Sequence, residues 1–329
     1  MTVSELGEFG LIERLAAIAG AEPPPDLIVG IGDDAAAWRV GEQVLLATTD
    51  TLVEGVHFLP EFAPWADVGW KALAVNVSDI AAMGGEPLFA LVTLMLPPES
   101  EAAYVEETYA GLMECAREYG VAVAGGDIVR APQVSVTIAL IGRAQMRDGE
   151  PLLMRRDGAK AGDAIAVTGT LGDSAAGLWR LRKGATEEDA LVRAHLRPLP
   201  RLAEAQEAAR AGIVCAIDVS DGLMQDLGHI CEMSGLAAEI REELLPLSDD
   251  SRAAYPEDAM ALAVSGGEDY ELLITGHEEA VEQVGDEISA TLTVIGRMVE
   301  STEHRPRLLD RAGNELAVAV HGWDHLHSG

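Results

Sequence analysis

The sequence is poor in lysine and cysteine, and each shortage excludes a class of protein. Only three lysines occur, and 23 basic residues against 55 acidic ones give a formal net charge of −32. Such a surface repels the phosphates of nucleic acids and of anionic membranes, so neither is an expected partner. The three cysteines form no C-x-x-C pair, which excludes a metal knuckle and a disulfide framework and predicts a cytoplasmic protein.

Long hydrophobic runs and several familiar catalytic motifs are also missing. The longest apolar run, residues 88–96, falls well short of the roughly 20 residues that a membrane helix needs. The acidic start, MTVSELGEFG, lacks the basic segment of a secretory signal. No lysine lies in a G-x-x-x-x-G-K-[ST] loop, and neither protein-kinase signatures nor a G-x-S-x-G elbow occurs.

Apolar content is ample, at 48% of residues, and it alternates between strand-like and helical patterns. The patterns predict strands over 43–49 and 134–142 and helices over 66–83 and 99–119. This alternation predicts an α/β (α+β) fold. Because 329 residues are many for one core, and residues 143–163 are rich in turn formers and charge, we expect two domains, 1–143 and 144–329.

The stretch GIGDDAAAW, residues 30–38, begins like the G-x-G-x-x-A loop that holds a dinucleotide pyrophosphate. Two acids, Asp33 and Asp34, stand at its variable positions and would repel that anion. A turn at Gly41 and a strand follow, whereas the dinucleotide fingerprint requires a helix. The stretch is therefore no Rossmann loop, and a cation is expected between its acids and any phosphate.

Five segments share one design, in which an acid follows an apolar or small-residue run. They are GIGDD, LLATTDT, AVNVSDIAAMGG, AVAGGD and AIDVSDG, and they carry Asp33, Asp34, Asp50, Asp79, Asp127, Asp218 and Asp221. One such acid alone is ordinary turn chemistry, but five at the ends of buried runs indicate a cluster. Asp79 is the most informative, because its helix is apolar on most sides and a buried carboxylate needs a partner.

Carboxylates mixed with hydroxyl groups are the ligands of a hard divalent cation, magnesium first. Zinc is disfavoured, because the eight histidines show no metal spacing. A carboxylate-rich site that holds several Mg²⁺ ions favours a polyphosphate ligand and phosphoryl transfer.

With these residues assembled, the sequence resembles the thiamine-monophosphate kinase family. This family belongs to the ATP-binding superfamily of aminoimidazole ribonucleotide synthetase and selenophosphate synthetase. The matching stretches run from GEFGLIERL to GWDH and include GIGDDAA, TTDTLVEGVHF, KALAVNVSDIAAMGG, GGDIVR, RRDGAKAGD, VTGTLGDSAAGL, HLRPLPR, DVSDGLMQDLGHI and SGGEDYELL. No cysteine precedes Cys115, unlike in selenophosphate synthetases, and the chain ends HLHSG, unlike hydrogenase-maturation proteins, which end in cysteine.

The resemblance implies an activity and an architecture. The activity is ATP-dependent phosphorylation of thiamine monophosphate to thiamine diphosphate by direct, Mg²⁺-assisted transfer. The architecture is a two-domain aminoimidazole ribonucleotide synthetase-like fold of mixed sheets flanked by helices. The N-terminal domain is expected to bind ATP and metal and to form a homodimer, and the C-terminal domain is expected to complete the active site.

The resemblance also implies a role for each matched residue. The implied magnesium ligands are Asp34, Thr48, Thr49, Asp50, Asp79, Asp127, Asp218 and Asp221, of which Asp50, Asp79 and Asp127 are the implied catalytic acids. The implied ATP contacts are Tyr109, Gly126, Asp127, Arg156 and Ser220, with Arg155 as the alternative to its neighbour. The implied contacts to thiamine phosphate are His57, Glu268 and Trp323.

Three other functions remain open on the residues. A magnesium-dependent phosphatase could use the same acids for hydrolysis, and another member of the superfamily could use the same fold. A non-catalytic ATP-binding regulator is expected to lose part of the acid cluster, whereas every acid is present here. Arg156 and the ordered motifs favour the kinase.

Overall fold

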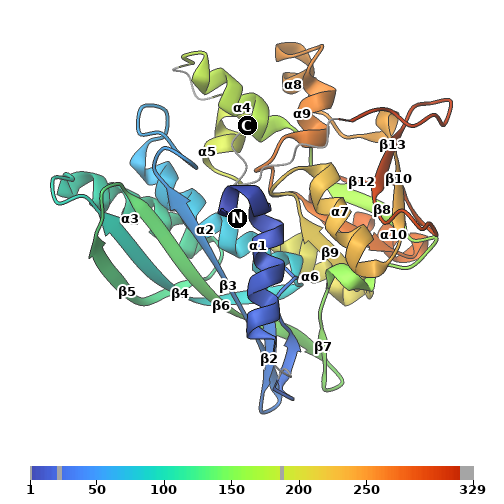
Figure 1. Cartoon of the computed structure of the whole chain (residues 1–329), viewed down its shortest axis with the longest axis horizontal. Helices are drawn as coiled ribbons and strands as arrows, with labels where there is room; N and C mark the ends of the chain where they lie inside the picture. Colours follow the sequence, from blue (N-terminus) through green and yellow to red (C-terminus); the bar gives the residue numbers. More distant parts are fainter. Residues whose placement is uncertain (1, 21–23, 186–188, 319–329) are drawn as a thin grey trace.

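The computed structural model describes residues 2–20, 24–185 and 189–318, and two mixed sheets lie side by side in it (Figure 1). Each sheet has its own helices and its own apolar core. The predicted α/β class with mixed sheets flanked by helices is confirmed. No helix among the described residues is long and apolar enough to cross a membrane.

The first sheet has seven strands within the described ranges, in the order β1-β2-β3-β6-β4-β5, with β7 paired to β6. The strands are β1 (Leu27–Val29), β2 (Ala36–Val40), β3 (Gln43–Val53), β4 (Gly85–Leu96), β5 (Ala122–Arg130), β6 (Ser135–Arg147) and β7 (Glu150–Leu152). Of the described strands in this sheet, only β4 and β5 pair in parallel. The expected division between residues 143 and 144 falls inside β6. The division stays a prediction.

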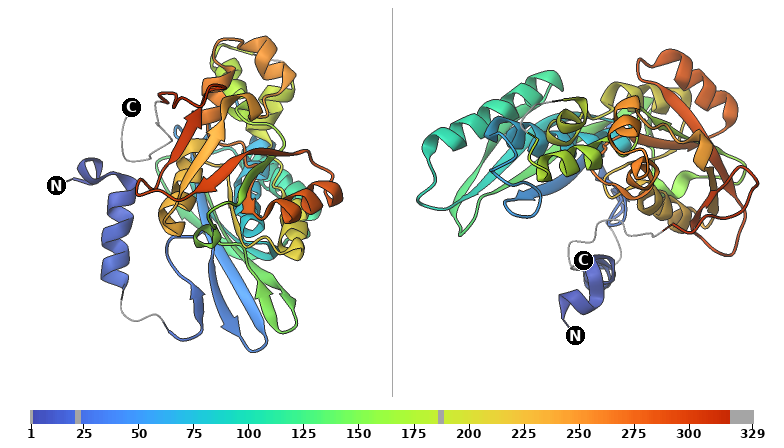
Figure 2. Two further views of the ribbon diagram at one scale, coloured as in Figure 1. Left: turned by 90° about the vertical axis from the view of Figure 1, so that its right-hand side faces the viewer. Right: turned by 90° about the horizontal axis from the view of Figure 1, so that it is seen from above.

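Helices α2 (Trp65–Ala82) and α3 (Ala102–Glu118) cover one face of this sheet (Figures 1 and 2). Alternate β4 residues, such as Ala90 and Val92, are buried toward the helices. The two helices pack so closely that a Cβ at Gly69 would lie 1.7 Å from the carbonyl oxygen of Thr108. Glycine is therefore required at this crossing to hold α2 in place.

The second sheet, in the part of the chain that the structure describes, has the order β13-β10-β12-β8-β11-β9. Its strands are β8 (Ala164–Thr168), β9 (Cys215–Asp218), β10 (Ala237–Arg241), β11 (Leu272–Gly276), β12 (Leu292–Val299) and β13 (Pro306–Leu309). Its helices are α4 (Asp173–Arg182), α5 (Ala190–Leu196), α6 (Leu202–Ala211), α7 (Leu223–Ser234), α8 (Asp249–Ala254), α9 (Ala259–Ser265) and α10 (Glu278–Glu287), and short 3₁₀ turns span Arg156–Gly158 and Glu242–Leu244.

Helix α2 joins the two halves. It packs on β3 and β6 of the first sheet and contacts β9 and α6 of the second half. The indole Nε1 of Trp70 donates a hydrogen bond of 2.9 Å to the carbonyl oxygen of Pro198. Helix α2 is mainly apolar, and both halves pack against it, so 14 of its 18 residues are buried, Lys71 among them. Any side chain on α2 that faces the second half can therefore take part in a site between them.

Helix α1 (Val3–Ala19) stands apart from the sheets (Figure 2). It begins with a capping box, in which the backbone N–H of Thr2 donates 2.7 Å to Glu5 Oε2, and it kinks at Gly7, where φ is 69°. Ile18 on α1 is 83% exposed. Within the described chain, α1 therefore adds little to either core.

Candidate active site

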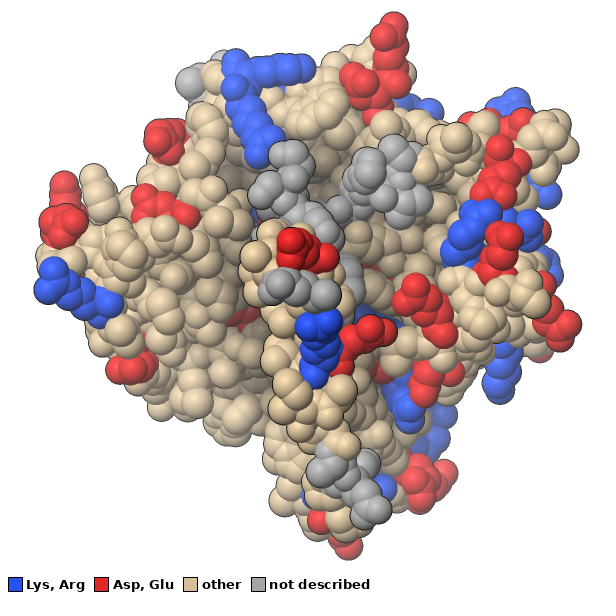
Figure 3. All heavy atoms as spheres, in the orientation of Figure 1, with Lys and Arg blue, Asp and Glu red and all other residues tan. Residues whose placement is uncertain are grey.

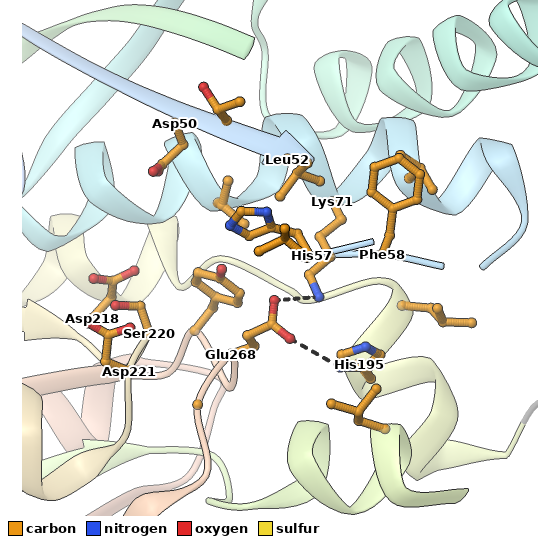
Figure 4. Close-up of a pocket in the computed structure, with 18 of the residues that line it drawn as sticks. Asp50, Leu52, His57, Phe58, Lys71, His195, Asp218, Ser220, Asp221 and Glu268 are labelled. Carbon is orange, nitrogen blue, oxygen red and sulfur yellow. Dashed lines mark ion pairs between the residues drawn. The ribbon is translucent and has the colours of Figure 1, made fainter. Parts of the chain in front are cut away.

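A cavity of about 540 Å³ lies where the two halves meet (Figure 4). It is lined from the first half by β3, residues 54–63 and α2, and from the second half by α4, α5 and the segments 218–221 and 265–270. One part of its wall is rich in carboxylates, and another is apolar, with Leu52, Phe58 and Phe62. The cavity can therefore hold a ligand that is charged at one end and apolar at the other.

Three carboxylates from distant segments converge in this wall. Asp34 follows β1, Asp79 lies on α2, and Asp218 ends β9, and one carboxylate oxygen of each lies within 4.8 Å of the others. Thr48 Oγ1 donates 2.6 Å to Asp79 Oδ2, and Ser78 Oγ donates 2.6 Å to Asp218 Oδ2. The structure thus brings together acids that the sequence predicted to cluster.

The electrostatics of this cluster favour a cation. Burial, followed by the charges of Asp50, Asp218 and Asp34, raises the pKa of Asp79 well above its usual value. Burial and Asp34 raise the pKa of Asp218 to about 7, although Ser78 and Arg156 act in the opposite direction. Among the described residues Asp34 Oδ2 is buried without a hydrogen-bond partner. Buried carboxylates that repel one another, one of them with an oxygen that lacks a donor, match the ligand set of a hard divalent ion.

Arg156 supplies one positive charge beside the acids. Its guanidinium pairs with Asp34, and its Nε lies 3.9 Å from Asp33 Oδ1. Burial and the Asp34 carboxylate raise the pKa of Asp33 to about 6, with Arg156 acting against them. Arg156 lines the cavity, whereas Arg155 pairs with Asp157 and does not line it. The geometry therefore favours Arg156 over its neighbour as the residue that faces a ligand.

Asp50 and Asp221 also line the cavity, each set in place by hydrogen bonds nearby. The backbone N–H of Asp50 donates 3.1 Å to Asn76 Oδ1, and Gln225 Nε2 donates 3.0 Å to Asp221 Oδ2. Asp226 accepts hydrogen bonds from the backbone N–H groups of Asp221 and Gly222 at 3.1 and 3.0 Å. Asp226 therefore shapes the turn that presents Asp221.

The hydroxyl groups that were predicted as ligands differ in their environment. Thr48 faces Asp79, and Ser220 lines the cavity. Thr49 also lines it, but its hydroxyl donates 2.9 Å to the carbonyl oxygen of Ile138. This hydrogen bond directs the hydroxyl proton of Thr49 away from the cavity, so a lone pair of Oγ1 remains available to a cation.

His57 and Glu268 lie toward the apolar part of the cavity (Figure 4). Nδ1 of His57 accepts from the backbone N–H of Val53 at 3.1 Å, so the neutral ring carries its proton on Nε2. Glu268 Oε1 pairs with Lys71 Nζ at 2.7 Å, and Glu268 Oε2 lies 3.4 Å from His195 Nδ1. The carboxylate of Glu268 is thus held between α2 and α5.

Two residues of this segment have strained backbones. Glu268 and Tyr270 adopt φ of 67° and 51°, a region that non-glycine residues rarely occupy. Asp269 between them accepts hydrogen bonds from the backbone N–H groups of Gly172 and Ser174 at 2.7 and 3.1 Å. Strain of this kind persists where neighbouring contacts fix the chain, and it is typical of functional sites.

Three predicted residues do not line this cavity within the described chain: Tyr109, Gly126 and Asp127. Asp127 lies in the middle of β5, an exposed strand at the sheet edge, rather than at a strand end as the sequence pattern suggested. Gly126 also has a packing role, because a Cβ there would lie 1.7 Å from the carbonyl oxygen of Val92. Trp323 lies outside the described residues.

The sequence reasoning missed Lys71, His195 and Asp226. Lys71 lies on α2 and pairs with Glu268. A lysine in an otherwise apolar helix is a usable signal, because a buried ammonium needs a partner. His195, in HLRPLPR, gave no such signal, because its site is made by Ser174 and Glu268 from other segments.

The chain is similar to known proteins over nearly its whole length. The family models described as AIR synthase related protein, N-terminal domain and C-terminal domain, match residues 32–144 and 160–308. The chain is 42% identical to Thiamine-monophosphate kinase of Escherichia coli O157:H7, over 97% of this chain and 98% of that protein. It is 40% identical to Thiamine-monophosphate kinase of Aquifex aeolicus, over 91% and 94%.

A solved structure, "AaThiL complexed with AMPPCP and TMP", has a TM-score of 0.87 and 36% identity, and the match covers 99% of both chains. A structure of "Hydrogenase Maturation Protein HypE in complex with ATP" has a TM-score of 0.73 at 19% identity, over 95% and 96%. The second likeness shows the shared fold alone.

Proposed function

The chain belongs to the thiamine-monophosphate kinases of the AIR synthase related family, and we propose that it phosphorylates thiamine monophosphate with ATP. The products are thiamine diphosphate and ADP. The observation that carries the proposal is the placing of an acid cluster and an apolar, Glu268-bearing wall in one cavity. The cytoplasm, where ATP is regenerated, is the compartment that this reaction requires.

The chemistry needs little acid–base catalysis. A phosphate oxygen of thiamine monophosphate attacks the γ-phosphorus of ATP, and the bond from that phosphorus to the oxygen bridging to the β-phosphate breaks. The second pKa of a phosphate monoester is near 6, so the attacking oxygen is already ionised at neutral pH. The protein must instead bring two polyanions together and hold them in line.

The acid cluster fits magnesium, on the evidence of the orphaned Asp34 Oδ2 and the raised pKa values of Asp79 and Asp218. We assign several Mg²⁺ ions to the carboxylates and hydroxyls of this wall, which are Asp34, Thr48, Thr49, Asp50, Asp79, Asp218 and Asp221. Bound magnesium neutralises the phosphate charge that would otherwise oppose transfer. Asp50 and Asp79 would contribute to catalysis as carboxylates that hold magnesium near the reacting phosphates.

Arg156 and Ser220 bind the nucleotide phosphates in this proposal. Arg156 is pre-positioned by Asp33 and Asp34, and its planar guanidinium can present two donors to a phosphate. Ser220 lies between Asp218 and Asp221 at the end of β9, where its hydroxyl lines the cavity. ATP thus lies along the acid wall, with its γ-phosphate toward the apolar part.

The thiamine end of the substrate fits the other part of the cavity. His57 and Glu268 line it together with Phe58 and Phe62. The thiazolium ring is flat and cationic, so it gains from apolar packing and from the Glu268 carboxylate. Trp323 completes this contact in the proposal as a stacking residue.

We further propose a homodimer formed through the first sheet. Its face opposite α2 exposes Phe89 and Leu91 on β4 and Val129 on β5, at 41 to 50% exposure. Few charged side chains lie over these strands (Figure 3). An apolar face beside a free strand edge is typical of a protein interface. In such a dimer the partner supplies Gly126 and the metal-binding, catalytic Asp127, which the cavity of a single chain lacks.

A turnover assay tests the function. The purified protein with ATP and Mg²⁺ is given thiamine monophosphate or thiamine, and ADP and thiamine diphosphate are measured. We expect both products only with thiamine monophosphate and Mg²⁺. Phosphate released from thiamine monophosphate without ATP would instead indicate a phosphatase, and ATP binding without turnover would indicate a regulator.

A further inference from the structure

Lys71 is a buried cation that points into the cavity. Its side chain projects from α2, is 5% exposed, and lines the cavity beside His57 and Glu268 (Figure 4). Apart from the ion pair of 2.7 Å with Glu268, its ammonium has no hydrogen-bond partner among the described residues. An ammonium carries three donors, so Lys71 keeps unused binding capacity inside the site.

The partner of Lys71 is held in place by other contacts. The backbone N–H of Glu268 donates 2.7 Å to the carbonyl oxygen of Ser220, and the residue keeps its strained φ of 67°. Burial raises the pKa of Glu268, but the contact with the Lys71 ammonium, followed by His195, more than offsets it and leaves the pKa below its usual value. The site therefore holds a carboxylate and an ammonium that pair with each other.

The substrate carries the same two charges. Thiamine monophosphate combines a cationic thiazolium with an anionic phosphate, whereas thiamine has only the cation. We propose that binding exchanges ion pairs: Glu268 passes from Lys71 to the thiazolium, and Lys71 passes to the phosphate. This inference rests on the proposed function and names Lys71 as a residue that determines specificity.

The exchange selects for a phosphorylated ligand. When thiamine monophosphate binds, each protein charge loses one partner and gains another. When thiamine binds, its thiazolium competes for Glu268, and Lys71 is left buried without a counter-ion, which is costly. Specificity then comes from the penalty on the wrong ligand as well as from contacts with the right one.

Binding measurements on Lys71 variants test the exchange. Isothermal titration with Mg²⁺ and a non-hydrolysable ATP analogue gives Kd values for thiamine monophosphate and for thiamine. In Lys71→Met we expect the Kd of thiamine monophosphate to rise at least about tenfold, because a charged hydrogen bond is lost. We expect the Kd of thiamine to stay constant or fall, because Glu268 has lost its competitor. Lys160→Met, at an exposed lysine, is the matched control and should change neither value.

Conservative variants separate this role from a structural one. Lys71→Arg keeps the charge and should restore most of the discrimination between the two ligands. If Lys71→Met folds poorly, Lys71→Gln replaces it, and the same two changes in Kd are expected. An equal loss of affinity for both ligands in Lys71→Met and Lys71→Gln would overturn the exchange. Failure of the wild type to form thiamine diphosphate would overturn the proposed function instead, while the two Kd values would still decide the role of Lys71.

Discussion

At the scale of single residues, Asp79 shows how a group can be unfavourable for folding and yet suited to bind a cation. Its carboxylate is surrounded by Asp34, Asp50 and Asp218, and its pKa is raised well above the usual value by burial and by these charges. A group in this position opposes the metal-free fold when it is ionised. We expect a bound cation to offset the free-energy cost of burying this charge.

We expect Asp79→Asn to lose nearly all phosphoryl transfer without losing stability. The substitution keeps the size and removes one metal ligand and one repelling charge. In the presence of a chelator the unfolding midpoint should therefore equal or exceed that of the wild type, while the stabilisation by added Mg²⁺ should shrink. Asp148→Asn, at an exposed turn residue with φ of 53°, is the matched control. Full activity in Asp79→Asn would contradict the cluster.

His195 gives a prediction about pH. Burial, helped by the charge of Lys71, lowers the pKa of His195 to about 3, against 6.5 for the ordinary side chain. Between these values the unfolded chain binds a proton that the folded chain does not, so stability falls as pH falls below 6.5. The contribution is at most about 1.4 kcal/mol per pH unit.

Urea unfolding of His195→Asn at pH 7, 6 and 5 checks this contribution. Asparagine cannot take up the proton, so the loss of unfolding free energy toward pH 5 should be smaller than in the wild type. The variant His304→Asn, at an exposed position, isolates the effect of burial. Identical slopes for His195→Asn and the wild type would show that His195 is protonated in the fold.

At the scale of elements, the crossing of α2 and α3 depends on glycine. Gly69→Ala would normally strengthen a helix, but here the new Cβ would lie 1.7 Å from the carbonyl oxygen of Thr108. We expect the substitution to lower the free energy of unfolding by about 3 kcal/mol or more, because backbone must move. Gly10→Ala in α1 is the control, since its Cβ would meet nothing closer than 3.9 Å, and it should not destabilise.

Elements with strong periodicity were the most predictable from the sequence. The helix expected over 66–83 is observed as Trp65–Ala82, because apolar residues on all sides match burial between two halves. Helix α1 was missed, although Thr2 and Glu5 form a capping box that signals its start. Strand β5 runs through GGD to Arg130, and the sequence pattern placed Asp127 at the end of a run because it does not show that Gly126 packs inside the strand.

The candidate site was predicted in its residue types but not in its partners. Apolar runs that end in acids indicated Asp34, Asp79 and Asp218, and the structure brings these three together. The pairing of Lys71 with Glu268 joins residues 197 positions apart, which no spacing rule reaches. Local patterns report what a segment offers, whereas partners are set by the packing of the whole chain.

At the scale of the whole molecule, the position of Asp127 gives the sharpest test of assembly. Asp127 lies on an exposed edge strand of one chain, and it does not line the cavity of that chain. If it acts in the partner's site, then Asp127→Asn and Asp79→Asn damage different parts of each dimeric site. A dimer with one copy of each variant then has one doubly damaged site and one intact site.

We expect each variant alone to be nearly inactive. When the two variants are co-expressed in equal amounts, half of the dimers are mixed, and each mixed dimer has one intact site out of two. The mixture should therefore regain about a quarter of wild-type activity. Light scattering should give the mass of a dimer for both variants. Val129→Lys, on the apolar face, should yield monomers and abolish the recovery. If monomers recovered activity, or if verified mixed dimers did not, Asp127 would act in the site of its own chain or outside the reaction altogether.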